Sequence, residues 1–126
     1  MTIITREKLE KNKLPGRVIE KAVGIDAYSK SMKMTIGFAT YSIQSGVMEP
    51  HQHAEETVFI TRSKGGCLRF GPEKNDLPNA VPLAEGMILH IPELEWHVFE
   101  YDEGGMVEIM YIYGQVDNIR PEEIRK

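Results

Sequence analysis

Residues 86–97, which read GMILHIPELEWH, contain the densest structural signal in the chain. Gly86 predicts a turn, the apolar residues after it predict a strand, and Pro92 predicts a second turn. His97 follows and begins a further predicted strand over residues 97–100. Considered alone, a histidine in this position is more often a core side chain satisfied by a hydrogen bond than a metal ligand.

A second histidine-containing stretch precedes it and reads GVMEPHQH over residues 46–53. His51 and His53 are two positions apart, so on a strand their side chains point to the same face. A pair of neighbouring imidazoles suits Zn, Fe, Ni, Cu and, together with carboxylates, Mn. Two incidental histidines on a solvated loop remain the competing interpretation of this stretch alone.

Around these stretches, strand-like segments rich in β-branched and aromatic residues alternate with turn residues. No apolar repeat of helical spacing persists over three turns, which excludes a helical bundle. Many short strands predict an all-β sandwich, barrel or jelly roll. The predicted strands are 17–23, 34–43, 57–62, 67–70, 87–91, 97–100 and 106–113, with turns at 45–46, 64–66, 71–79, 85–86 and 102–105.

The ends of the chain differ from this pattern. Residues 5–11 predict a short polar helical segment or turn, with Thr5 as its N-cap and an end at Pro15 and Gly16. The C-terminal residues 117–126 predict either one helical turn from Pro121 or a frayed terminus. We expect a single domain over residues 1–126, with an N-terminal arm (1–23), a core (34–113) and a C-terminal tail (114–126).

Composition limits the classes of partner. Lys and Arg number 15 and Asp and Glu number 19, so the formal charge of −4 offers no footprint for nucleic acid or an anionic membrane. Cys67 is the only cysteine, so neither an intrachain disulfide nor a cysteine metal site is expected. The sequence shows no signal-like start and no bilayer-length apolar run, and we therefore expect a cytoplasmic protein.

Taken together, the two histidine stretches resemble the cupin family. Its motifs have the forms G-x(4–5)-H-x-H-x(3–4)-E-x(6)-G and G-x(5)-P-x-G-x(2)-H. The matching residues are Gly46, His51, His53, Gly86, Pro92 and His97, and the resemblance covers about residues 34–113. It implies a cupin-like jelly-roll β-barrel, the double-stranded β-helix. It also implies an internal metal bound by the three histidines and a motif-one glutamate, and frequent dimerisation.

The acidic ligand departs from the family pattern. The expected spacing after His53 lands on Thr57 or Val58, whereas the available carboxylates are Glu55 and Glu56. A one-residue deletion after His53, offset by a longer turn at residues 64–66, would make Glu56 the ligand. The alternative leaves Thr57 facing the metal in a three-histidine site. We favour Glu56, because a carboxylate offsets the charge of the metal. An unligated Glu55 is the candidate base, although a solvated position competes with that role.

Two further expectations concern residues 86–97. Leu94 stands where the family usually has glycine, which tolerates positive φ. Leucine avoids that conformation, so we expect the turn over residues 92–95 to have a different shape. His90 alternates with Leu89 and Ile91, so it points away from the metal if those two line the barrel. A surface position, a dimer contact or plain packing is then expected for His90.

Three imidazoles, with or without one carboxylate, leave open positions on a six-coordinate ion. We expect a divalent transition metal (Zn, Fe, Mn, Ni or Cu) and a metalloenzyme that acts on a sugar, keto acid or carboxylic acid. Isomerase, lyase or decarboxylase, and dioxygenase chemistry all remain open. The alternatives are a non-catalytic small-ligand-binding module and a metal-free barrel. A homodimer is also expected, with the strand at residues 17–23 as a candidate for pairing with a partner chain.

Overall fold

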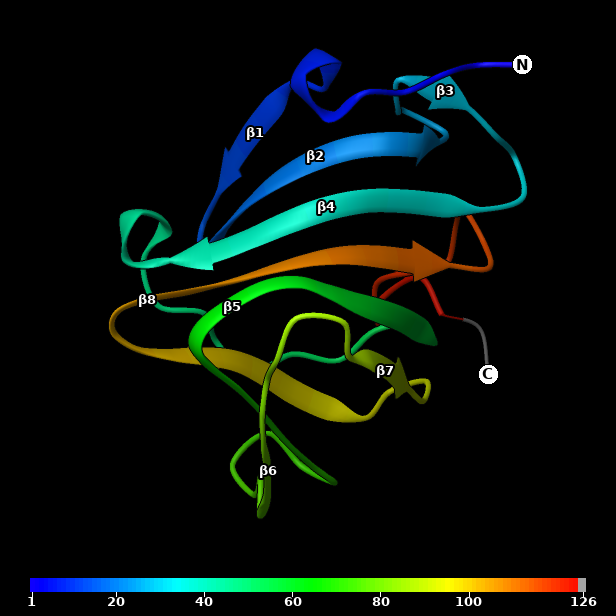
Figure 1. Ribbon diagram of the computed structural model, residues 1–126. Coiled ribbons are helices and arrows are strands. Elements are labelled where there is room, and N and C mark those ends of the chain that lie inside the picture. The colour runs from blue at the N-terminus through cyan, green and yellow to red at the C-terminus, as the bar shows by residue number, and fades with distance from the viewer. Residues whose placement is uncertain (125–126) are drawn as a thin grey trace.

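The computed structural model describes residues 1–124 and is built mainly of antiparallel strands (Figure 1). The strands form one sheet in the order β1-β2-β4-β8-β5-β6, with β3 paired to β2 and β7 paired to β5. The strand bounds are β1 Lys11–Leu14, β2 Arg17–Gly24, β3 Ser29–Lys30, β4 Thr35–Ser42, β5 Glu56–Gly71, β6 Asn79–Pro82, β7 Ile88–Ile91 and β8 Trp96–Tyr113. The predicted all-β class is confirmed, and it includes three short strands, β1, β3 and β6, that the sequence did not indicate.

The two long strands, β5 and β8, close the sheet on itself. Each bends at the same side of the molecule and passes from one layer to the other, which produces a jelly roll (Figure 1). At the bend Lys64 pairs with Met106 and Gly66 pairs with Tyr101, so the four residues 102–105 of β8 lie opposite the single residue Gly65 of β5. The turns predicted at 64–66 and 102–105 were expected to end one strand and begin another. That prediction is wrong, because β5 and β8 each continue through these segments. Gly65 and Gly104 have positive φ, which serves a bend inside a strand as well as a turn between strands.

A second irregularity adds one residue to β5. Ile60 pairs with Ile109 and Arg62 pairs with Glu108, which leaves Thr61 as a bulge. The Thr61 hydroxyl donates to the backbone and side-chain oxygens of Glu108 at 3.0 and 2.9 Å. The extra residue that we expected in the turn at 64–66 thus lies at Thr61 instead.

The core lies between the two layers, on the inward faces of the strands. Val58 and Ile60 on β5 pack with Val107 and Ile109 on β8, and all four are buried. Because side chains alternate along a strand, Glu56 shares the inward face of Val58. Toward one end of the barrel this inward face changes from apolar to polar, and that end contains the candidate site.

The N-terminal residues cover one edge of the sheet. The predicted short helical segment is a single 3-10 turn, η1 (Arg6–Lys8). The carbonyl of Thr5 accepts a hydrogen bond from the Lys8 amide at 3.0 Å, but the Thr5 side chain makes no capping bond. A second 3-10 turn, η2 (Ile43–Ser45), follows β4.

Strand β2 has neighbours on both sides within its own chain. It pairs with β1 through a turn at Pro15 and Gly16, and with β4 along its other edge. The expectation that residues 17–23 pair with a partner chain is therefore wrong, because β1 and β4 already use the backbone hydrogen-bonding groups of β2. The sequence does not indicate this hairpin, because residues 5–11 predict a polar helical segment and Pro15 and Gly16 then indicate its end.

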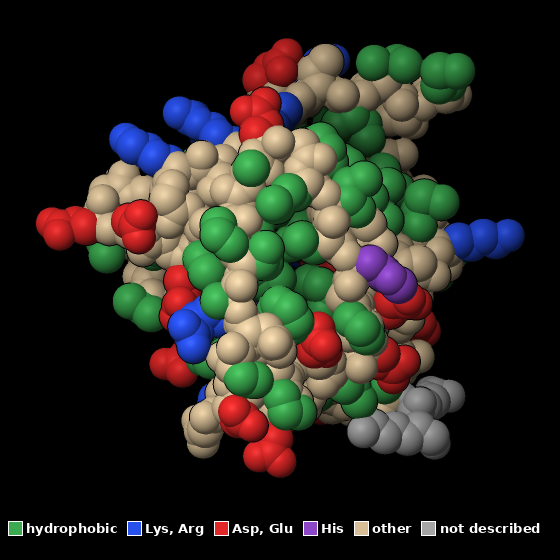
Figure 2. Space-filling view, turned by 60° about the horizontal axis from the view of Figure 1, so that its bottom comes forward, with side chains coloured by type: hydrophobic (Ala, Val, Ile, Leu, Met, Phe, Trp, Pro, Cys, Tyr) green, Lys and Arg blue, Asp and Glu red, His purple; other side chains and the backbone are tan. Residues whose placement is uncertain are grey.

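The exposed surface carries charges of both signs. On the face shown in Figure 2 hydrophobic side chains gather toward the middle, and charged side chains lie mostly toward the margin. Within residues 1–124, no helix has the length and apolar character needed to cross a bilayer.

Candidate metal centre

Three of the four histidines converge at the polar end of the barrel. His51 and His97 are joined by two backbone hydrogen bonds, in which each amide donates to the carbonyl of the other at 3.0 and 2.9 Å. His53 lies two residues beyond His51, on the same side. One ring nitrogen from each histidine lies within 4.8 Å of the other two. Two segments that are distant in the sequence thus present three nitrogen donors to one point.

Hydrogen bonds set the orientation of all three rings. A backbone carbonyl can only accept a hydrogen bond, so a neutral ring that contacts one through Nδ1 carries its proton there. The remaining atom, Nε2, then offers a free lone pair, as a metal ligand requires. The Nδ1–carbonyl pairs are His51 with Glu49 at 3.2 Å, His53 with Ala54 at 2.9 Å and His97 with Glu95 at 2.8 Å.

The spacing of two of these lone pairs fits a shared ion. The Nε2 atoms of His53 and His97 lie 3.1 Å apart. Two imidazole nitrogens at about 2.1 Å from one ion, at right angles, are about 3.0 Å apart. Because both protons are engaged at Nδ1, two acceptor atoms face each other, and a cation between them relieves the repulsion. The donor set therefore fits a divalent transition metal.

The histidines are neutral at pH 7. Burial, together with the neighbouring His97 and His53, lowers the pKa of His51 to about 3. Burial also lowers the pKa of His53 to about 4 and lowers the pKa of His97. Neutral imidazole is the form that ligates a metal, so the site is ready to bind without losing protons.

Glu56 is the carboxylate nearest to the three rings. It is buried, and its Oε1 lies 3.4 Å from Nε2 of His53. Burial raises the pKa of Glu56 to about 8, and a hydrogen bond with Tyr113 opposes the rise. An adjacent cation favours the ionised form of such a group.

Thr57 and Glu55 lie outside the cavity. Thr57 pairs with His90 and Ile112 on the face opposite to Glu56, so the alternative that placed Thr57 at the metal is wrong. Glu55 lies on the surface, where it contacts Nε2 of His90 at 2.6 Å. The side chains of Glu55 and His90 are 62% and 63% exposed. Glu55, the candidate base, therefore lies outside the cavity, and its role as a base stays a prediction; the outward direction of His90 is confirmed.

Leu94 adopts the conformation that we expected it to avoid. Its φ is 64°, in the left-handed region where the family usually has glycine. The Leu94 amide donates to the carbonyl of His53 at 2.9 Å. The turn over residues 92–95 therefore retains a left-handed residue, because this hydrogen bond and the position of His97 outweigh the local strain.

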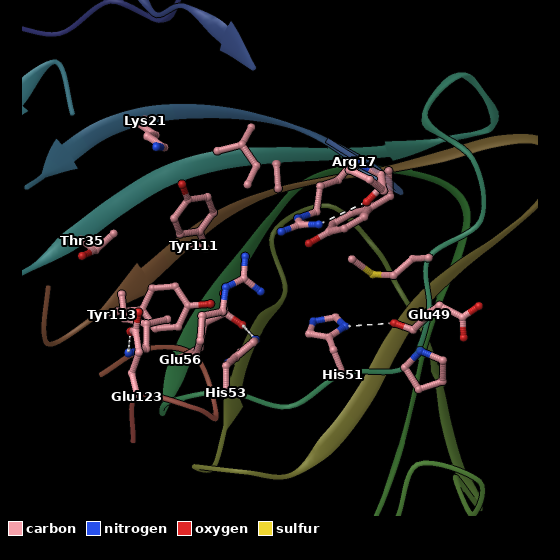
Figure 3. A pocket seen from close by; sticks show the side chains of 18 of the residues that line it. Arg17, Lys21, Thr35, Glu49, His51, His53, Glu56, Tyr111, Tyr113 and Glu123 are labelled. Carbon is pink, nitrogen blue, oxygen red and sulfur yellow. Dashed lines mark hydrogen bonds and ion pairs between the residues drawn. The ribbon is translucent and has the colours of Figure 1, made fainter. Parts of the chain in front are cut away.

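A cavity of about 550 Å³ opens onto the site (Figure 3). His51, His53 and Glu56 lie on its wall, whereas His97, only 1% exposed, lies behind them. The tail after β8 closes part of the wall, because the Ala54 amide donates to the carbonyl of Ile119 at 2.8 Å. The tail forms one turn at residues 121–123.

Sequence reasoning missed most of the remaining wall. Tyr111 and Tyr113 share the inward face of β8, and the ring centroids of Tyr113 and His53 are 5.4 Å apart. Burial raises the pKa of Tyr111 to about 12 and that of Tyr113 well above its usual value, so both hydroxyls keep their protons. The sequence signal that could have placed them was their alternation with Ile109, because residues 109, 111 and 113 of one strand share a face. No comparable signal marked Arg17, Arg120 or Ile119.

Comparison with known proteins supports the fold. No protein-family model and no curated protein sequence matches the chain. A protein from Planctomyces limnophilus has a similar solved structure, with a TM-score of 0.70, 15% identity, and coverage of 98% of this chain and 94% of that chain. The polyketide cyclase RemF from Streptomyces resistomycificus follows with a TM-score of 0.69, 16% identity, and coverage of 89% and 78%. Fe(II)-HppE with the alternative substrate (S)-1-HPP has a TM-score of 0.63, 13% identity, and coverage of 89% and 59%. These neighbours are cupin-fold proteins, and this chain has the cupin fold.

Proposed function

We propose that His51, His53 and His97, together with Glu56, hold one divalent transition metal ion, and that the protein is a metalloenzyme for a small polar molecule. One observation carries the proposal: each Nδ1 contacts a backbone carbonyl, the Nε2 atoms of His53 and His97 lie 3.1 Å apart, and one ring nitrogen of each of the three histidines lies within 4.8 Å of the other two. Structural histidines in a core usually satisfy both ring nitrogens with protein partners. Here the Nε2 atoms of His53 and His97 face each other, and that of His53 also lies near Glu56.

A bound ion of this class supplies Lewis-acid or redox chemistry. The residues of the chain provide the rest of the site. The Tyr111 and Tyr113 hydroxyls are both held in the neutral form; Tyr111 donates a hydrogen bond to an oxygen of the bound molecule, while Tyr113 hydrogen-bonds to Glu56. Glu56 serves as the carboxylate ligand, whereas the exposed Glu55 lies outside the cavity.

The substrate is a sugar, keto acid or carboxylic acid, and the reaction is an isomerisation, a lyase or decarboxylase step, or a dioxygenation. Neighbours of this fold include a polyketide cyclase and an Fe(II) protein in complex with a substrate, which supports an enzymatic role in general. Zn, Fe, Mn, Ni and Cu all accept three imidazoles with one carboxylate.

The second candidate function is a non-catalytic module that binds a small ligand, with the metal as its anchor. The surface position of Glu55 favours this function. Among the described residues it leaves Glu56 as the one carboxyl beside the histidines, and Glu56 is already assigned to the metal. Product analysis of each bound ligand separates the two functions, since a binding module returns its ligand unchanged.

We also propose that residues 1–126 act as one cytoplasmic domain and form a homodimer. An outward row of apolar side chains crosses four strands, and its end residue, Ile88, is 68% exposed. The row consists of Ile88, Phe59, Met110 and Phe38 in successive register. A second copy that covers this row would remove apolar surface from water. Light scattering after size exclusion gives the mass that tests the homodimer.

Elemental analysis tests the metal site. Protein purified without added metal should contain stoichiometric transition metal, and the double variant His51→Ala/His97→Ala should lose it. His90→Ala is the matched control, because His90 is exposed and paired with Glu55. Wild-type protein that holds no metal even after reconstitution would contradict the proposal.

A further inference from the structure

Three basic side chains line the cavity of the candidate metal centre. Arg17 and Lys21 are both on β2, where their even spacing puts them on the inward face, and Arg120 comes from the tail. In Figure 3, Arg17 and Lys21 approach the cavity from one wall, while His51 and His53 lie on the opposite side. Two separate segments therefore direct positive charge toward the same space.

These cations have no acidic partner among residues 1–124. Arg17 donates one hydrogen bond, to the carbonyl of Pro15 at 3.2 Å, and neither it nor Lys21 nor Arg120 takes part in an ion pair there. In contrast, Arg6 contacts the carboxylates of two glutamates at 2.8 and 2.9 Å. A guanidinium has five N–H donors, so Arg17 keeps most of its hydrogen-bonding capacity for a ligand.

The acidic residues on the cavity wall do not neutralise the arginines. Glu49 and Glu123 are exposed, and Glu123 accepts a hydrogen bond from the backbone amide of Ile119 at 3.1 Å. Glu56 lies beside His53. The positive charges thus remain available to a bound molecule.

Both arginines act on the same interior group. Burial raises the pKa of the Tyr111 hydroxyl to about 12, and the charges of Arg17 and Arg120 both oppose this rise. This agrees with the position of both arginines on the wall of the cavity that Tyr111 also lines.

We infer that the cavity takes a small organic anion, whose carboxylate or phosphate group is bound by Arg17 and Arg120 while a second oxygen reaches the metal centre. The inference rests on the function proposed above. It narrows the proposed substrates to small molecules that carry a negative charge, which excludes uncharged sugars. Guanidinium groups bind carboxylate and phosphate through paired hydrogen bonds. A cavity of about 550 Å³ accommodates a metabolite-sized molecule. Lys21, exposed at the margin, attracts the anion electrostatically.

Calorimetric titration of the metal-loaded protein tests the inference, with succinate, glycerol phosphate and uncharged erythritol as probes. At least one anion should bind saturably, and erythritol should not; the preferred anion distinguishes carboxylate from phosphate. Each single variant, Arg17→Gln or Arg120→Gln, should weaken anion binding about tenfold, and the double variant more. Binding should also weaken as sodium chloride is raised. Arg69→Gln is the control, because Arg69 is half-exposed and lies 3.9 Å from Glu100.

The metal content is measured on every sample, so that failure of the anion site can be distinguished from failure of the proposed metal site. If the protein holds metal but no anion binds, or the double variant binds as tightly as wild type, or erythritol binds equally well, the inference is overturned while the metal site stands. If anions bind through the arginines to protein that holds no metal after reconstitution, the proposed function fails and the arginine site stands.

Discussion

The backbones of His51 and His97 hydrogen-bond to each other in both directions, with N···O distances of 3.0 and 2.9 Å. This pair of bonds joins the two histidine stretches and holds the two rings with their centroids 4.4 Å apart. The ligand geometry is therefore formed by the fold itself, and an ion that binds does not have to order a loop. Preorganisation of this kind favours tight binding because little conformational entropy is lost.

Metal binding should raise the thermal stability of the wild-type protein. An ion that binds only the folded state stabilises it by about 2.7 kcal/mol when its free concentration is about 100 times Kd. Differential scanning calorimetry with and without a chelator measures this difference. His53→Ala should abolish the response, and His90→Ala should preserve it. An equal response in both variants would contradict the site.

Replacement of Glu56 by Gln should weaken metal affinity about tenfold or more while leaving the fold intact, because a neutral amide replaces a carboxyl of the same shape. The control variants Glu55→Gln and Thr57→Val should bind metal as wild type does, since both side chains lie outside the cavity. Competition against a chromogenic chelator gives the affinities. Unchanged affinity in Glu56→Gln would remove Glu56 from the ligand set.

Substitutions at Leu94 should show whether backbone strain or side-chain packing at this residue has the larger effect on the free energy of unfolding. A left-handed conformation costs a leucine about 1–2 kcal/mol. Leu94→Gly should therefore stay within about 1 kcal/mol of wild type, since relief of strain offsets lost contacts and greater freedom of the unfolded chain. Leu94→Val should destabilise the protein by about 1–3 kcal/mol, because β-branched residues tolerate positive φ poorly. Urea denaturation measures both; equal stability of the two variants would exclude strain as the cause.

Arg6 should be important for stability although it is partly exposed. It contacts the buried carboxylate of Glu20 at 2.8 Å and lies 4.4 Å from the ring centroid of Phe38. Arg6→Ala leaves Glu20 buried without a cation and should destabilise the fold by about 3 kcal/mol. Arg69→Ala, which removes a solvent-screened pair with Glu100 and an exposed hydrogen bond to the carbonyl of Leu77, should cost less than about 1 kcal/mol. Chemical denaturation of both variants checks the contrast.

The stability of the metal-free protein should be greatest just above pH 6.5. The pKa values of His51 and His53 fall to about 3 and about 4, below the usual 6.5, so the unfolded state binds more protons and stability is lost as pH falls below 6.5. The pKa of Glu56 rises from 4.5 to about 8, so its effect is a loss of stability as pH rises toward 8. At pH 5 to 6 the several histidines outweigh the single glutamate.

Denaturation curves measured from pH 5 to 8 test this profile. The variant Glu56→Gln should lack the decline above pH 6.5, because a glutamine does not titrate. A wild-type profile that levels off above pH 7 instead of declining, as expected for Glu56→Gln, would show that Glu56 ionises in the folded protein at its ordinary pKa.

Much of the architecture was predictable because it depends on local chemistry. Alternating β-branched and aromatic residues specify strands, and the positions of β2, β4 and β7 agree with those segments. The long strands β5 and β8 were each divided in two, because glycines at 65 and 104 suit a bend and a turn equally. Only the partner strand shows which of the two forms, since the hydrogen-bond ladder continues past the bend.

The sequence by itself determined the all-β class and the spacing of His51, His53 and His97. The strand expected at His51 and His53 is reduced to a single bridge between His51 and His97, and the tertiary contacts bring the rings together. Tertiary structure decided which neighbour enters the barrel: pairing with β7 and β8 turns Glu56 inward and Glu55 and Thr57 outward. It also held Leu94 in a left-handed turn and folded Arg120 back onto the cavity. These features depend on contacts between distant segments, whose combined free energy outweighs the preferences of single residues.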